Sequence, residues 1–259
     1  MTIRNIVNLA NGCMILALAA GAASASTSFD FSTQTGNSGS GMGDSLSFAS
    51  GGITITETAW WLSTSSPTSG TTFEKAEVDA YNGYGLGVCD PTEGSNCGSP
   101  SHQVTNDQGV DFILLTFSSP VSLQSLTNNL SLLHYANVNG SSNTSNADIE
   151  YWTPSGALTT STTLGSLGTG TDVNNGCTTA PCTVTDTVTG GTSVSELLIA
   201  AQPGADSNDV AFKLAALTVN SSASSNQSST PEPSTEILLG SGLLAASALM
   251  RRRNKNADR

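Results

Sequence analysis

One stretch of the sequence gathers the side chains best suited to binding a metal. Asp90, Glu93, Asp107 and Asp111 lie close together in the chain, with Asn106 between them. Calcium takes about six to eight oxygen ligands from carboxylates, amides and main-chain carbonyls. The stretch therefore predicts a structural Ca²⁺ site, although its spacing is not that of an EF-hand. The alternative is a solvated acidic loop, and no other cofactor is expected.

Histidine chemistry is the second candidate in this stretch. His102 lies among the same acidic residues, and it is one of only two histidines in the chain. A Ser-His-Asp triad could be drawn around it, but 39 serines make any such choice arbitrary. The G-x-S-x-G, H-E-x-x-H and P-loop patterns are all missing from the sequence. We therefore expect a protein that is not an enzyme, and a secreted hydrolase is the least favoured alternative.

Two adjacent tryptophans, Trp60 and Trp61, could contribute to a sugar-binding surface. Neighbouring residues of a strand point to opposite faces. One ring is therefore expected in the core and the other on the surface, where it could stack on a sugar. This pattern gives the alternative function, a carbohydrate-binding module with an exopolysaccharide as its partner.

Four cysteines follow residue 25: Cys89, Cys97, Cys177 and Cys182. An even number of cysteines in an exported chain indicates disulfides, and four cysteines can be paired in three ways. Proximity in the chain favours Cys89–Cys97 and Cys177–Cys182. Their spacings are not those of zinc sites, so metal binding by cysteine is the weaker interpretation.

The charge distribution excludes one class of partner. Residues 26–230 contain only two positive side chains, Lys75 and Lys213, against 17 Asp and Glu, which gives a net charge of −15. Nucleic-acid binding depends on neutralising phosphates with Lys and Arg. We therefore expect no nucleic-acid partner.

The first 25 residues have the features of a signal peptide. Arg4 provides a positive start, an apolar run covers residues 13–20, and residues 23–25 read Ala-Ser-Ala. A small-x-small triplet after a short apolar run is typical of signal cleavage. The sequence predicts removal of residues 1–25 and a mature chain that starts at Ser26.

The C-terminal end has three parts in a fixed order. A Ser-rich linker at 220–230 precedes a tail at 231–259, which holds Pro231-Glu232-Pro233, an apolar run at 237–250 and Arg251-Arg252-Arg253. A helix of this length spans about 21 Å. That is shorter than the hydrocarbon core of about 30 Å, so the segment is a marginal membrane helix. The arginines would remain on the cytoplasmic side.

This tail closely resembles the PEP-CTERM sorting signal of Gram-negative bacteria. The resemblance implies an exosortase, a membrane transpeptidase-like protease, as the processing partner. It also implies transient anchoring in the inner membrane, followed by a place on the cell surface or in the extracellular matrix. The alternative is a plain tail anchor that is never cleaved.

The elements between these ends are predicted to be strands. Serine and threonine number 39 and 33, and short apolar stretches alternate with Gly, Ser, Asn and Pro clusters. Residues 110–117 are the most apolar run and are expected to form a central buried strand, which Pro120 would end. Such a pattern indicates a sandwich or barrel. We expect an all-β chain in which residues 26–219 form a single jelly-roll-like β-sandwich.

The body also resembles, more weakly, a group of exosortase-dependent surface proteins. The resemblance implies a β-sandwich without known catalysis. It rests on three blocks: Gly85-Leu86-Gly87-Val88; Ser101-His102-Gln103-Val104 with Asp107, Asp111 and the strand that ends at Phe117; and Asp148-Ile149, Leu198-Ile199-Ala200-Ala201 and Phe212-Lys213-Leu214.

Overall fold

A computed structural model describes most of the body of the chain. The described residues are 26–37, 41–93, 97, 102–106, 108–129, 146–176, 183–188, 193–203 and 211–221. The predicted signal peptide, the tail and its helix at 237–250 lie outside them, as does nearly all of the linker. Among the described residues, no helix has the length and apolar character needed to cross a membrane.

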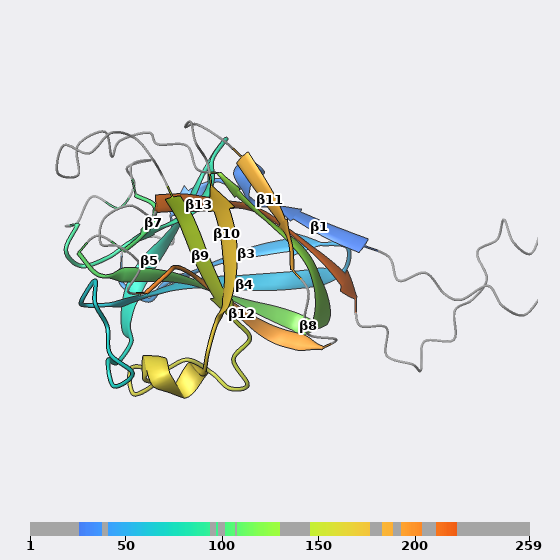
Figure 1. The fold of residues 1–259 in the computed structure, drawn as a ribbon. Coiled ribbons are helices and arrows are strands. Elements are labelled where there is room, and N and C mark those ends of the chain that lie inside the picture. Colours follow the sequence, from blue (N-terminus) through green and yellow to red (C-terminus); the bar gives the residue numbers. More distant parts are fainter. Residues whose placement is uncertain are drawn as a thin grey trace, which may run out of the picture. The chain divides into compact units, whose positions relative to one another are not determined.

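The described elements are strands and two short 3-10 helices. The strands are β1 Ser26–Asp30, β2 Gly36–Asn37, β3 Ser45–Ser50, β4 Ile53–Leu62, β5 Glu74–Tyr81, β6 Gly85–Cys89, β7 Val104–Thr105, β8 Val110–Asn129, β9 Asn146–Trp152, β10 Thr171–Gly176, β11 Thr183–Thr187, β12 Val194–Ala201 and β13 Ala211–Ser221. The helices are η1 Phe31–Thr33 and η2 Leu164–Leu167. The all-β prediction is confirmed (Figure 1).

The strand pairing closes on itself. The sheet runs β1-β13-β6-β5-β4-β8-β12-β9-β10, and an additional pairing of β13 with β8 closes five of these strands into a barrel. The long strand β8 makes this closure possible, because its first half pairs with β4 and its second half with β13. The architecture is therefore a closed barrel with added strands, which differs from the two separate sheets of the expected sandwich.

Pro120 is exposed and lies in β8 between the half that pairs with β4 and the half that pairs with β13. Proline has no N–H to donate to a ladder, so it suits a position where the strand changes partners. The expected strand at 110–117 is confirmed, but the expected stop at Pro120 is wrong: one strand continues through it and changes its pairing partner there.

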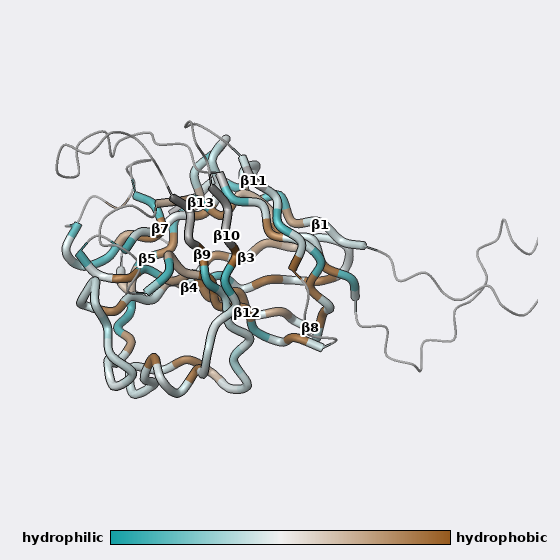
Figure 2. Tube along the Cα trace, in the orientation of Figure 1, coloured by the Kyte–Doolittle hydropathy of each residue, from teal (hydrophilic) through white to brown (hydrophobic). Residues whose placement is uncertain are grey.

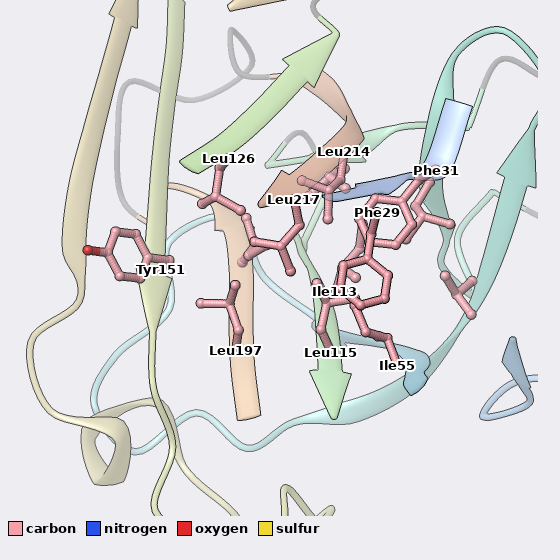
Figure 3. Packing of buried hydrophobic residues seen from close by; sticks show 14 of the residues in the cluster. Phe29, Phe31, Ile55, Ile113, Leu115, Leu126, Tyr151, Leu197, Leu214 and Leu217 are labelled. Atoms are coloured by element: carbon pink, nitrogen blue, oxygen red, sulfur yellow. The ribbon is translucent and has the colours of Figure 1, made fainter. Parts of the chain in front are cut away.

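An inner core fills the space that the sheet encloses. Side chains from the first strand to the last point toward one another there (Figure 3), and they include Phe29, Phe31, Ile55, Ile113, Leu115, Leu126, Leu197, Leu214 and Leu217. Each of these nine side chains is fully buried. In Figure 2 the strands carry most of the apolar residues, as expected when alternate positions face a core.

A second apolar cluster, the apolar layer, lies on the opposite face of β4, β8, β12 and β9. Its members are Trp60, Leu62, Phe73, Val110, Phe112, Leu114, Trp152, Leu158, Leu198 and Ala200. The segments 63–73 and 153–168 cover this face and pair with each other, since Phe73 N donates to Thr162 O at 3.1 Å and Leu164 N to Thr71 O at 3.0 Å. Leu164 and Leu167 of η2 pack against the layer.

The two ends of the body meet in one strand pair. β1 runs antiparallel to the end of β13, with Ser26 opposite Asn220 and Asp30 opposite Ala216. Phe29 of β1 is fully buried in the inner core, so the strand is an integral part of the barrel. The first residue of the body therefore lies beside its last few residues (Figure 1).

Candidate functional site

A buried set of polar side chains, the polar layer, lies on the face of β5, β6 and β13 that points away from the inner core. Ala76, Val78 and Ala80 of β5 face the inner core. The alternate residues of β5 must therefore point to the other face. With neighbours from β6 and β13, that face carries Glu77, Asp79, Tyr81, Cys89 and Lys213, each no more than 7% exposed.

The segment Asp90–Asn106 covers this layer, as far as its described residues show. Glycine at position 87 permits the close approach, because a Cβ there would collide with the carbonyl oxygen of His102 and touch the ring of Tyr81. Hydrogen bonds from Tyr81 and Lys213 hold the cover on the barrel. Tyr81 Oη donates to the Cys97 carbonyl at 2.9 Å, and Lys213 Nζ donates to the His102 carbonyl.

A disulfide closes the cover. Cys89 at the end of β6 is bonded to Cys97, with their Cα atoms 5.5 Å apart. The predicted pairing of these two cysteines is confirmed. Cys177 and Cys182 lie outside the described residues, so their pairing stays a prediction.

Lys213 is the central charged group of the layer. It is 2% exposed, and its Nζ lies 4.1 Å from the centroid of the Tyr81 ring. Burial lowers the pKa of Lys213 to about 7, although the nearby Glu93 and Asp79 carboxylates oppose the shift. An ammonium in this position is stabilised by the ring face, the His102 carbonyl and these two acids.

His102 is held by Glu93. The His102 Nδ1 and Glu93 Oε2 atoms are 2.8 Å apart, and both side chains are largely buried. With Cys89, these two residues form the one group of possible metal-ligand atoms, among the described residues, that lie within 4.8 Å of one another. The Cys89 sulfur is already bonded to Cys97, so it is not a thiolate ligand while the disulfide is intact.

The predicted calcium residues are brought to the same end of the barrel, but their carboxylates do not form one compact ligand set. Asp90 and Glu93 act electrostatically on Asp111. Among the described residues, however, these three acids do not form a group whose carboxylate oxygens all lie within 4.8 Å of one another. Asp107 lies outside the described residues. The full four-carboxylate site therefore stays a prediction.

Burial raises the pKa values of two of these acids. The pKa of Asp111, which is fully buried, lies well above its usual range, because burial and then the neighbouring Asp90 and Glu93 disfavour its charge. Two hydrogen bonds from Thr105 act in the opposite direction. Burial likewise raises the pKa of Asp90, and hydrogen bonds from Thr92 oppose that shift.

The tryptophan prediction is half wrong. Trp60 and Trp61 do point to opposite faces, Trp61 into the inner core and Trp60 into the apolar layer. Neither is on the surface, however, since they are 7% and 5% exposed. The second face is covered by the segments 63–73 and 153–168, so neither ring offers a platform for a sugar.

The sorting residues Pro231, Glu232, Pro233, Arg251, Arg252 and Arg253 lie outside the described residues. Conversely, the structure assigns importance to Asp79 and Lys213, for which the sequence predicts no site role, and to Tyr81, which on sequence alone could only extend the tryptophan sugar platform. One signal was available for Lys213: a single lysine stands between Phe212 and Leu214 in an apolar strand, in a body with only two lysines. Its partners come from distant segments, so the sequence could not name them.

The polar layer holds the cover segment on the barrel. The titratable side chains of the layer, of the cover and of the adjoining start of β8 expose almost no surface to a substrate. His102 is 7% exposed, Asp111 is fully buried and Lys213 is 2% exposed.

Comparison with known protein families, curated proteins and solved structures found no match to this chain.

Proposed function

We propose that this chain is an exported, non-enzymatic surface or extracellular-matrix protein whose body is delivered by two removable ends. An exosortase would recognise the C-terminal Pro-Glu-Pro tail while the apolar run holds the chain in the inner membrane. Cleavage would then release the body to the cell surface or beyond.

The position of the first strand is the observation that carries this proposal. β1 starts at Ser26, the residue that follows the predicted signal cleavage, and β13 ends at Ser221, within the start of the predicted linker. Strand pairing places Ser26 opposite Asn220. All described strand pairs lie between these two residues, so removal of either end would leave those pairs intact.

Two further features support the proposal. The Cys89–Cys97 disulfide suits a protein that matures in an oxidising compartment. In addition, the titratable groups of the polar layer are buried beneath a closed segment, which favours a structural role for them over catalysis.

The test is a variant of the sorting motif in the native host. Replacing Pro231, Glu232 and Pro233 by alanine is expected to abolish release and leave the chain with its tail in the membrane fraction. The matched control replaces Ser228 and Ser229 of the linker by alanine and should be released normally. Release of the motif variant at the wild-type level would contradict the proposal.

A further inference from the structure

The β7–β8 turn, by which we mean the end of β7 and the start of β8 with Thr105, Asn106 and Asp111, contains a buried carboxylate. One oxygen of this carboxylate is hydrogen-bonded and the other has no donor in the described part of the chain. Asp111 Oδ2 accepts from the N–H and the hydroxyl of Thr105, at 3.0 and 3.1 Å. Its other oxygen, Oδ1, is buried and has no hydrogen-bond partner in the described part of the chain. Leaving such a buried acceptor without a donor destabilises the folded chain, and more so when the group is charged.

The same turn holds a second oxygen in this condition. Asn106 directly follows Thr105 and is 1% exposed. Its amide nitrogen donates to the Gln202 carbonyl at 3.4 Å, which leaves Oδ1 as the acceptor end of the group. Within the described ranges Asn106 Oδ1 also has no donor. Thus two side chains of this turn each present a buried oxygen that lacks a partner in the described part of the chain.

The surroundings add negative charge to Asp111 itself, through Asp90 and Glu93. Glu93 is paired with His102 and lies near Lys213, but neither of these cationic groups contributes to the shift of the Asp111 pKa. The other lysine of residues 26–221, Lys75, lies near Gly43. A cation from solution would therefore compensate the charge of Asp111, for which the described side chains supply no cation.

We propose that a calcium ion binds in this turn, with Asp111 Oδ1 and Asn106 Oδ1 among its ligands. Carboxylate and amide oxygens are hard donors that suit Ca²⁺, and extracellular calcium modules bind with dissociation constants of about 0.1–1 mM. The site differs from the Cys89–Glu93–His102 group, whose sulfur and imidazole donors do not suit calcium. It does not depend on the sorting tail, so it can fail while the proposed function stands.

Terbium luminescence tests the site directly, because β4 places a tryptophan beside it. Trp61 lies opposite Asp111 in the β4–β8 register, so a Tb³⁺ ion in the turn would be sensitised by excitation of tryptophan. We expect Tb³⁺ emission from the purified chain that Ca²⁺ displaces. We also expect the melting temperature to rise by about 3–5 °C when Ca²⁺ is at roughly ten times its dissociation constant.

Glu74 provides the matched control. It lies opposite Trp61 on the other neighbouring strand and is exposed. Asp111→Asn should weaken Tb³⁺ binding tenfold or more, whereas Glu74→Gln should leave it unchanged. An emission signal that Glu74→Gln removes would overturn the assignment. So would a wild-type melting temperature that millimolar Ca²⁺ leaves unchanged, a measurement that needs no variant to fold; the two oxygens would then be satisfied by water or by a proton.

Discussion

The apolar layer and the polar layer are built on opposite chemistry although both are buried under covering segments. Segments 63–73 and 153–168 cover Trp60, Phe112 and Trp152, and the rings of Phe112 and Trp152 pack against each other. Segment Asp90–Asn106 covers Tyr81 and Lys213 and is held by a disulfide and by hydrogen bonds to main-chain carbonyls.

This difference shows how a loop can be fixed on a barrel in two ways. An apolar cover is stabilised by the burial of apolar surface, and this contribution is non-directional and insensitive to pH. A polar cover depends on a few donors that must meet particular acceptors, and each buried charge costs free energy unless it is compensated. Substitutions in the two layers should therefore differ in size and in pH dependence.

The largest loss of stability is expected in the apolar layer. Phe112 is fully buried, with its ring centroid 4.9 Å from that of Phe73 and 5.8 Å from that of Trp152. Phe112→Ala should lower the free energy of unfolding by about 3–5 kcal/mol. Denaturant unfolding at several pH values measures it, and the loss should not vary with pH. Thr56→Ala, at an exposed position on β4, should change the same quantity by less than about 0.5 kcal/mol.

Removing the disulfide of the polar layer is expected to cost less. Cys89→Ala with Cys97→Ala should lower the free energy of unfolding by about 2.5 kcal/mol, because the closed loop is short and restricts the unfolded chain only moderately. Denaturant unfolding of the oxidised proteins gives this value. With a thiol reductant present, wild type and variant should become nearly equal; a difference that persists would show that the cysteine side chains act through packing.

Lys213 should give the polar layer a pH dependence that the apolar layer lacks. Its pKa is about 7 in the folded chain and 10.5 in the unfolded chain, so the unfolded state binds more protons between these values. Stability relative to Lys213→Met should therefore rise with pH in that window, by about 1–2 kcal/mol between pH 7 and pH 9. Lys75→Met is the control. Parallel pH profiles for wild type and Lys213→Met would contradict the assignment.

The smallest effect is expected for Tyr81→Phe. The substitution keeps the ring beneath Lys213 and removes the hydroxyl that donates to the Cys97 carbonyl at 2.9 Å. The free energy of unfolding should fall by about 1 kcal/mol. Equilibrium unfolding detects this change, and hydrogen exchange should rise in the described cover residues but not in η2. Equal exchange in both covers would mean that this hydroxyl does not fix the cover.

The strands were more predictable from the sequence than the layers outside them. The apolar run at 110–117 follows from the burial of both faces of a strand, and the alternation of isoleucine and threonine at 53–56 follows from the burial of one face. Whether the second face of a strand is covered depends instead on loops without periodicity. Segment 153–168 contributes only scattered leucines, Leu158, Leu164 and Leu167, so the burial of Trp60 could not be anticipated.

The candidate site divides in the same way. Cys89 and Cys97 are near in the chain, and proximity predicted their bond correctly. Lys213, Tyr81 and His102 come together because β13 and β5 both pair with β6 and the cover lies over them, and β13 is far from β5 and β6 in the chain. A single sequence carries no local signal for such contacts.

The intact mass of the protein recovered from the native cell surface tests whether both targeting ends are removed from the barrel. We predict a chain that begins at Ser26 and ends near Pro231–Pro233, with every described strand retained. A mass that still includes Arg259 would contradict it, and the tail would then be a permanent anchor.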